Sequence, residues 1–257
     1  PLMTLACRQY NTHNEGPWLV WLHGLLGDSH EWETVIKACH EYPSLVIDLP
    51  RHGNSASIGV NNFVEMSALL HDTLKEYDIN HYWLIGYSLG GRIAMYHACF
   101  GETSGLMGLI VEGGNPGLYD AIERQNRIAH DKRWAARFRN EPINDVLTQW
   151  YQQPVFADLS DEMRQLLVEK RSSNAGFCIA ESLETLSLGH QPWLVAELQQ
   201  LTLPFIWLCG EQDKKFQSIA QQYSLPLTTI PQAGHNAHQA QPDAYAAVIN
   251  HVLSLFG

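Results

Sequence analysis

Three residues of this chain have the types and the order along the sequence of a nucleophile, an acid and a base. Ser88 is the centre of Gly86-Tyr87-Ser88-Leu89-Gly90. An apolar run ends directly before this pentapeptide and a helical pattern follows it, so the sequence predicts a sharp strand-to-helix turn. Such a turn strains the backbone of the serine and exposes its hydroxyl group at the edge of a sheet.

The acid and the base follow later in the chain. A serine hydroxyl is a weak nucleophile or base unless an imidazole accepts its proton and a carboxylate orients that imidazole. Asp213 and His235 each come just after an apolar run, so both are expected at the same sheet edge as Ser88. The order Ser, acid, His is the one that this turn requires. We therefore predict a triad, with Glu211 as the alternative acid.

A second short motif supplies hydrogen-bond donors. The first apolar run ends in His23-Gly24-Leu25-Leu26-Gly27. A loop at this point would place the backbone N–H of Leu25 beside that of Leu89, and two such donors form an oxyanion hole. The alternative interpretation is a tight turn that needs its glycines for conformational reasons only.

Arginines indicate the class of ligand. Arg92 lies one helical turn beyond Ser88, on a helix expected to be buried, where a guanidinium needs an anion. That anion is either a substrate carboxylate or an internal Asp or Glu. Three more arginines and two aromatic residues lie in a later helical region: Arg124, Arg127, Arg171, Trp150 and Tyr151. Arginines on exposed helix faces are common, and the aromatic residues could build the core of that region as well as a substrate wall.

The elements that must position these residues alternate along the chain. Short apolar runs, which predict strands buried on both faces, occupy 18–22, 45–47, 82–85, 109–111, 205–209 and 227–230. Helical patterns such as 63–77 and 88–100 lie between them, so we expect an α/β fold with a mostly parallel sheet. Only helical patterns occur over 117–191. We predict a helical insertion there, a lid over the strand ends, with 1–116 and 192–257 forming the core.

Composition narrows the function classes. The net charge is −11 and no basic stripe is present, which argues against nucleic-acid binding. Five scattered cysteines without metal-binding spacing predict reduced thiols in the cytoplasm, and neither a signal peptide nor a membrane span is expected. His235 and His238 lack an acidic third ligand, so no metal site is predicted. The oligomeric state stays open between a monomer and a homo-oligomer.

Four motifs are spread over nearly the whole chain: His23-Gly24, Asp48-Leu49-Pro50-x-His52-Gly53-x-Ser55, Gly86-Tyr87-Ser88-Leu89-Gly90-Gly91-Arg92 and Gly234-His235. Through them the chain resembles the α/β-hydrolase superfamily, although Arg51 departs from the usual glycine at its position. Three further motifs are Val111-Glu112-Gly113-Gly114-x-Pro116-Gly117-Leu118, Trp150-Tyr151-Gln152-Gln153-Pro154-Val155-Phe156 and Gly234-His235-Asn236-Ala237-His238. These carry a narrower resemblance, to the 2-succinyl-6-hydroxy-2,4-cyclohexadiene-1-carboxylate synthases of menaquinone biosynthesis.

This resemblance implies a lyase that eliminates pyruvate from a small polyanionic substrate without a cofactor. In that scheme Asp213 orients His235, which activates Ser88 to remove a proton from carbon. The resemblance also implies substrate-binding residues, which are Arg92, Arg127, Arg171, Tyr87 and Trp150. Two alternatives stay open: a serine esterase or carbon–carbon bond hydrolase with the same triad, and a non-catalytic ligand receptor built on the same fold.

Overall fold

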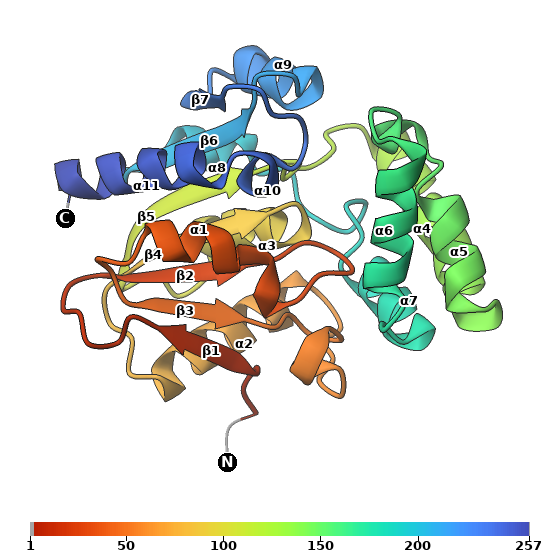
Figure 1. Ribbon diagram of the computed structural model, residues 1–257, viewed down its shortest axis with the longest axis horizontal. Coiled ribbons are helices and arrows are strands. Elements are labelled where there is room, and N and C mark those ends of the chain that lie inside the picture. The colour runs from red at the N-terminus through yellow and green to blue at the C-terminus, as the bar shows by residue number, and fades with distance from the viewer. Residues whose placement is uncertain (1–2, 257) are drawn as a thin grey trace.

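A seven-stranded sheet lies at the centre of the computed structural model, which describes residues 3–256 (Figure 1). The strands are β1 (Cys7–Tyr10), β2 (Trp18–Leu22), β3 (Ser44–Ile47), β4 (Tyr82–Tyr87), β5 (Leu106–Glu112), β6 (Phe205–Gly210) and β7 (Leu227–Ile230). Their order is β1-β3-β2-β4-β5-β6-β7. β1 pairs antiparallel with β3, and every other pair is parallel. The predicted parallel sheet is confirmed, while β1 was not expected.

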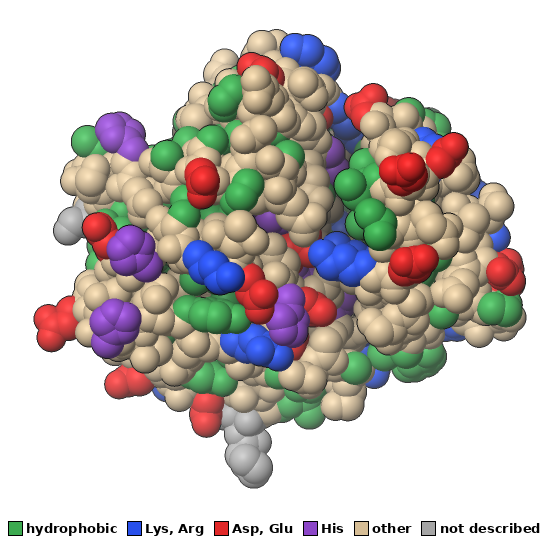
Figure 2. Space-filling view, viewed as in Figure 1, with side chains coloured by type: hydrophobic (Ala, Val, Ile, Leu, Met, Phe, Trp, Pro, Cys, Tyr) green, Lys and Arg blue, Asp and Glu red, His purple; other side chains and the backbone are tan. Residues whose placement is uncertain are grey.

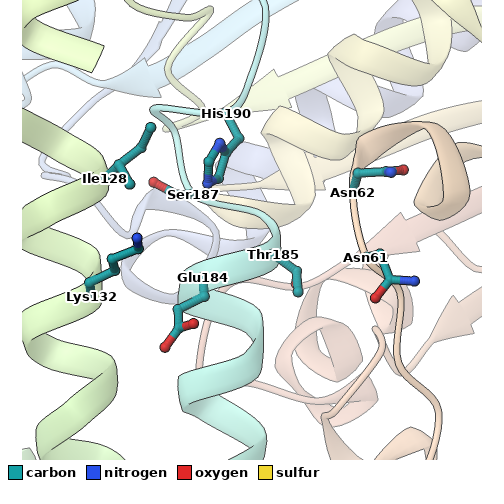
Figure 3. A pocket seen from close by; sticks show the side chains of 8 residues that line it. All are labelled: Asn61, Asn62, Ile128, Lys132, Glu184, Thr185, Ser187 and His190. Atoms are coloured by element: carbon teal, nitrogen blue, oxygen red, sulfur yellow. The ribbon is translucent and has the colours of Figure 1, made fainter. Parts of the chain in front are cut away.

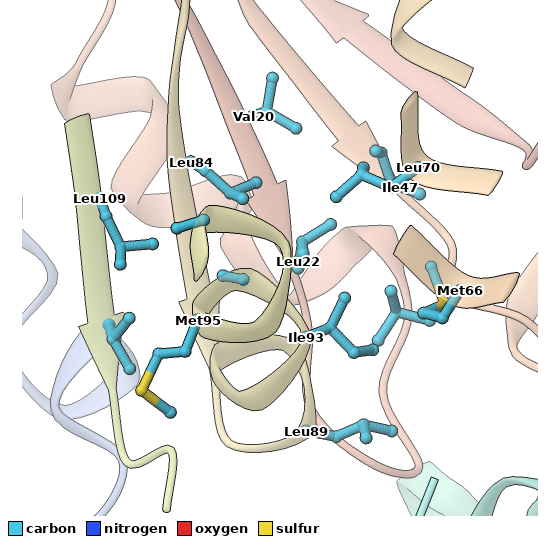
Figure 4. Close-up of a cluster of buried hydrophobic side chains, with 14 of the residues drawn as sticks. Val20, Leu22, Ile47, Met66, Leu70, Leu84, Leu89, Ile93, Met95 and Leu109 are labelled. Atoms are coloured by element: carbon cyan, nitrogen blue, oxygen red, sulfur yellow. The ribbon is translucent and has the colours of Figure 1, made fainter. Parts of the chain in front are cut away.

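Helices cover both faces of the sheet. One face packs against α2 (Phe63–Glu76), α3 (Leu89–Phe100), α8 (Val195–Gln199) and α9 (Lys214–Tyr223). The other face packs against α1 (Glu33–Ala38), α10 (Ala237–Ala240) and α11 (Pro242–Phe256). Within β2, Val20 and Leu22 face the first layer, and Leu19 and Trp21 face the second. Figure 4 shows the first cluster, in which side chains of α2 and α3 pack against the strands. Burial on both faces explains the continuous apolar runs.

A group of helices follows β5 and lies beside the sheet (Figure 1). These helices are α4 (Ala121–Asn140), α5 (Ile143–Trp150), α6 (Asp161–Arg171) and α7 (Gly176–Thr185), with a 3₁₀ turn at Pro154–Phe156. No strand interrupts them, and they pack around their own cluster, which includes Phe138, Leu147 and Ile179. All four fall within the predicted helical insertion, although the predicted boundaries between core and insertion stay a prediction.

Two 3₁₀ turns in the core complete the elements, at Ser29–Trp32 and Gly53–Ser55. Both follow strand ends on the edge of the sheet that carries the predicted site. Over residues 3–256, no helix has the length and the apolarity needed to cross a membrane.

Candidate active site

Ser88 lies in the turn between β4 and α3, with φ +54° and ψ −115°. Its N–H donates to the carbonyl of Glu112 at the end of β5, over 2.8 Å. Glycines make this turn possible. A Cβ at Gly86 would overlap the carbonyl of Gly90, and a Cβ at Gly90 would overlap the carbonyl of Leu22. The predicted strained turn is therefore present, and its strain is held by the neighbouring strands.

His235 and Asp213 form a hydrogen-bonded pair. The Nδ1 atom of His235 lies 3.2 Å from Oδ2 of Asp213, whose side chain is only 8% exposed. The ring of Phe216 stacks on the imidazole, with the ring centres 5.4 Å apart. The alternative acid, Glu211, instead accepts a hydrogen bond from the N–H of Gln232 over 2.8 Å. The carboxylate that orients the imidazole is thus Asp213.

The turn that carries Ser88 and the ring of His235 meet at the end of β5. Gly113, directly after Glu112, has φ +64°, and a Cβ there would lie 2.9 Å from Cε1 of His235. The Tyr87 ring, next to Ser88 in the chain, lies 5.6 Å from the His235 ring. Ser88 and His235 are not hydrogen-bonded to each other in the described structure. The complete triad therefore stays a prediction, supported by this proximity.

The predicted oxyanion loop, residues 23–27, lies against the turn that carries Ser88. A Cβ at Gly24 would lie 3.3 Å from Cβ of Ser88. The N–H groups of Leu26 and Gly27 are engaged within the loop or with His52, but the described hydrogen bonds do not include the N–H of Leu25. Leu89 is the first residue of α3, where a helix has no internal acceptor for the N–H. The oxyanion role of Leu25 and Leu89 stays a prediction, and it is consistent with these two N–H groups.

Two buried histidines hold this loop, a role that the sequence analysis did not assign. His23 accepts the N–H of Leu49, and His52 accepts the N–H of Leu26, each over 3.0 Å. The other ring nitrogen of each lies against a backbone carbonyl, which can only accept. Burial lowers the pKa of His23 to about 4 and that of His52 to about 3, so both are neutral at pH 7. Their position in His-Gly pairs was the available sequence signal.

Arg92 is held without a carboxylate partner among residues 3–256. Its Nη1 donates to the carbonyl of Leu186 over 2.8 Å and to Oε1 of Gln191 over 3.3 Å. The guanidinium also lies over the ring of Phe63, 5.8 Å from its centre. Burial and, to a lesser degree, the charge of Arg127 lower the pKa of Arg92 to about 10, so it is charged at neutral pH. The alternative of an internal ion pair is not what the structure contains.

The four arginines singled out in the sequence separate into two groups in the structure; they are Arg92, Arg124, Arg127 and Arg171. Arg127 pairs with Asp131 over 3.2 Å, is 41% exposed, and is close enough to Arg92 to affect its pKa. Arg124 donates to the carbonyl of Gln191 over 2.7 Å, the residue that Arg92 also contacts. Asp131 also accepts a hydrogen bond from the hydroxyl of Ser187 over 2.6 Å, so Arg92, Arg124 and Arg127 gather around the segment 186–191. Arg171 lies elsewhere, where its Nη2 donates to Glu31 over 3.1 Å.

The two aromatic residues differ in their surroundings. Tyr87 lies between His235 and His238, with its ring centre 4.5 Å from that of His238. Trp150 packs edge-to-face against Trp134, with ring centres 5.0 Å apart. Tyr87 is thus at the candidate site, whereas Trp150 belongs to the packing of the helical insertion. Substrate contacts of either residue stay a prediction.

Two cavities outside the triad are present in the described structure. The larger, of about 460 Å³, lies between the start of α2 and helices α4 and α7, and is lined by Lys132, Glu184 and His190 among others (Figure 3). The smaller, of about 180 Å³, lies between the loop after β3 and the end of α6. Neither is lined by a predicted triad residue. Figure 2 shows a hollow between the core and the helical insertion, in which Lys or Arg and His side chains are visible.

Within residues 3–256, no three Cys, His, Asp or Glu side chains are grouped closely enough to hold a metal ion. The expectation that no metal or organic cofactor is needed stays a prediction. His235 and His238, whose spacing raised the question, both lie against carboxylates of the protein itself.

Comparison with known proteins shows which family the chain belongs to. Residues 19–248 match the alpha/beta hydrolase family. A 2-succinyl-6-hydroxy-2,4-cyclohexadiene-1-carboxylate synthase of Photorhabdus laumondii is 60% identical over 254 residues, covering 99% of this chain and 91% of the relative. One from Yersinia pseudotuberculosis is 54% identical over 260 residues, with coverages of 98% and 96%.

Two solved structures are similar to this chain. MenH from S. aureus superposes with a TM-score of 0.88 at 29% identity, and 98% of each chain is covered. An esterase from Thermogutta terrifontis superposes with a TM-score of 0.81 at 22% identity, covering 98% of this chain and 93% of the esterase. This second likeness concerns the fold alone.

Proposed function

Because the chain belongs to the α/β-hydrolase family and to its 2-succinyl-6-hydroxy-2,4-cyclohexadiene-1-carboxylate synthases, we propose that it catalyses that synthesis. The substrate is 2-succinyl-5-enolpyruvyl-6-hydroxy-3-cyclohexene-1-carboxylate, and pyruvate is the second product. The full-length identity of 60% carries the proposal. The cytoplasm is the proposed location, supported by five cysteines that are all free.

The reaction requires a base and an electrophile. The ring double bond lies at carbon 3 of the substrate, whereas the product has double bonds at carbons 2 and 4. A proton therefore leaves carbon 2, the bond shifts, and the ether oxygen leaves carbon 5 as enolpyruvate, which takes up a proton to become pyruvate. The succinyl ketone next to carbon 2 accepts the negative charge as an enolate oxygen.

The described geometry supports a role for each triad residue. Asp213 orients the imidazole of His235 through Nδ1, which leaves Nε2 to accept the proton of the Ser88 hydroxyl. Ser88 then removes the ring proton. The N–H groups of Leu25 and Leu89 hold the enolate oxygen, and the loss of one such donor typically costs roughly 3 to 4 kcal/mol of transition-state stabilisation.

The substrate carries three carboxylates, on the succinyl chain, the ring and the enolpyruvyl group. A protein with a net charge of −11 binds such an anion where its cations converge in one cleft. Arg92, which has no carboxylate partner among the residues that the structure describes, and the half-exposed Arg127 supply that charge. Arg171 contributes to binding only by exchanging its bond to Glu31, and Tyr87 and Trp150 are proposed as neighbouring walls.

The test is incubation of the purified protein with the substrate, with pyruvate measured by coupled reduction to lactate. We expect pyruvate release by the wild type and its loss in Ser88→Ala. Glu211→Gln is the control, because Glu211 follows the same strand as Asp213, and among the described residues its carboxylate accepts a hydrogen bond only from the N–H of Gln232. An acyl adduct on Ser88 with the natural substrate would favour the hydrolase alternative. Binding without turnover would favour the receptor.

A further inference from the structure

The side chain of Gln191 is completely buried between α7 and α8, and both ends of its amide form hydrogen bonds. Its Oε1 atom accepts a hydrogen bond from Nη1 of Arg92 over 3.3 Å. Its Nε2 atom donates to the carbonyl of Asn115, which lies between β5 and α4, over 3.0 Å. One amide group thus joins Arg92 on α3 to the segment that follows β5.

These contacts hold one corner of the Arg92 guanidinium. Nη1 donates to the carbonyl of Leu186 over 2.8 Å as well as to Gln191, so both of its hydrogens have acceptors. Nε and Nη2 have no acceptor among residues 3–256, and neither atom is fully buried. The N–H groups of Nε and Nη2 are parallel, which is the arrangement that binds a carboxylate through two hydrogen bonds. The edge of Arg92 that fits a carboxylate is therefore open.

The acidic side chain nearest to this region is already engaged by other groups. Asp131 accepts a hydrogen bond from Nε of Arg127 over 3.2 Å and another from the hydroxyl of Ser187 over 2.6 Å. Burial and the charge of Arg127 lower the pKa of Arg92 to about 10, and Asp131 opposes this only in part. Among the described residues, Arg92 thus carries a positive charge that no carboxylate in contact with it balances.

An amide at position 191 has the shape of a carboxylate without its charge. A glutamate at this position would place a carboxylate oxygen where Oε1 now lies, 3.3 Å from Nη1 of Arg92. Such an ion pair would balance the charge of Arg92 and would compete with an incoming anion. Glutamine therefore orients the guanidinium and leaves its charge available.

We propose that Gln191 is a positioning residue for substrate binding: its amide holds Nη1 of Arg92 without neutralising it, and so presents the Nε–Nη2 edge to a carboxylate of the substrate. Gln191 acts through Arg92 and does not touch the substrate. This inference rests on the proposed function, because the carboxylate belongs to the proposed substrate. It adds a residue that makes the site selective for anions.

The experiment compares two replacements of Gln191 by kcat and KM for pyruvate release and by melting temperature. Gln191→Met keeps the length of the side chain and removes both hydrogen bonds, whereas Gln191→Glu keeps the shape and adds a negative charge. The matched control is Gln199→Glu. The exposed Gln199 also donates through Nε2 to a backbone carbonyl, that of Tyr223, over 2.8 Å.

We expect Gln191→Glu to raise KM by about tenfold or more, because the substrate must then compete with an internal carboxylate for Arg92. Gln191→Met should lower kcat/KM by about five- to tenfold, since the guanidinium keeps its charge but loses its orientation. The KM of Gln191→Met should rise less than that of Gln191→Glu, and Gln199→Glu should match the wild type. Equal KM values for the two Gln191 variants would contradict the proposal.

A double-variant cycle separates positioning from packing. In a protein that already carries Arg92→Met, the further change Gln191→Met should alter kcat/KM by less than about twofold, because no guanidinium is left to hold. A purely structural role of Gln191 gives the same loss with and without Arg92, and that result would overturn the proposal. The cycle also carries the test if Gln191→Glu does not fold.

A measurement without substrate tests the charge of Arg92. Phenylglyoxal reacts with the neutral form of the guanidinium, so an ion pair, which raises the pKa of Arg92, slows the reaction. Peptide mapping gives the rate at Arg92. We expect Gln191→Glu to lower this rate by about tenfold or more and Gln199→Glu to leave it unchanged.

The inference and the proposed function fail in different measurements. A phenylglyoxal rate at Arg92 that Gln191→Glu leaves unchanged would refute the role of Gln191, whatever the turnover. A lowered rate in a protein whose wild type releases no pyruvate would keep the contact between Gln191 and a charged Arg92 and would reject the proposed function instead.

Discussion

Replacing Arg92 with lysine separates the role of this residue in substrate binding from its role in holding the helical insertion. Lysine keeps the positive charge but cannot form two parallel hydrogen bonds with a carboxylate. A hydrogen bond to a charged group is worth roughly 1.5 to 3 kcal/mol, which corresponds to a loss of roughly 10- to 150-fold in kcat/KM. Arg92→Ala should lose more.

The structure also gives the size of the stability effect. Arg92 donates to the carbonyl of Leu186, a neutral acceptor, over 2.8 Å. Because the donor is charged, the loss of such a bond costs at least roughly 1.5 kcal/mol, which lowers the melting temperature of a chain of this size by at least roughly 3 to 6 °C. Arg124→Lys is a matched control, since Arg124 donates to the carbonyl of Gln191 in the same segment. We expect it to lower the melting temperature similarly while kcat/KM changes by less than about threefold.

The assay measures pyruvate release per folded molecule together with the melting temperature. A variant Arg92→Lys that melts earlier but keeps kcat/KM within about twofold of the wild type would refute the substrate role. Arg92 would then be an anchor between α3 and the segment after α7, and the polyanionic substrate would lose its strongest support in the site.

Three further predictions concern the triad, metals and pH. Ser88→Ala, Asp213→Asn and His235→Ala should each lower kcat by at least about 100-fold without adding to one another, and a double variant that loses the product of the single effects would contradict a common unit. Exhaustive chelation should leave pyruvate release unchanged, and restoration by added zinc or magnesium after a loss would contradict this. Glu112 and Glu31 raise the pKa of His238 to about 9, so the folded protein holds the proton of this imidazole more tightly than the unfolded chain does. The resulting stabilisation of the fold is on the order of 3 kcal/mol; it is fully present below pH 6.5 and is lost as the pH rises through 9. Melting curves from pH 6 to 10 should show this decrease in the wild type and not in His238→Gln.

The sequence predicted the parallel strands because each is buried on both faces and therefore continuously apolar. β1 has no such pattern: Cys7, Arg8, Gln9 and Tyr10 lie at the edge of the sheet, where half of the residues face solvent. The position of β1 is set by backbone hydrogen bonds to β3, and these bonds do not require a particular pattern of side chains. An edge strand of four residues is therefore hard to recognise from composition.

Site residues were predictable where a local motif fixes the backbone, and less so where distant segments meet. The turn around Ser88 follows from its glycines. The choice between Asp213 and Glu211 depends on which carboxylate the turn after β6 directs towards His235, and only the fold decides that. The Glu31–His238–Glu112 contacts join residues more than 120 positions apart, and the one local signal was a glutamate, Glu112, at the end of an apolar strand.

The packing of Leu25 and Leu26 limits how this molecule can evolve. Leu26 belongs to the apolar cluster of the helical insertion. Leu25 packs against that cluster and also against the cluster between the sheet and helices α2, α3, α8 and α9. Core side chains are close-packed, so a volume change on one side is felt on the other. An insertion transplanted from a relative onto this sheet would therefore have to bring matching residues at these two positions. Substitutions in the insertion and at Leu25 and Leu26 are thus expected to be correlated, even though about 100 residues of chain separate them.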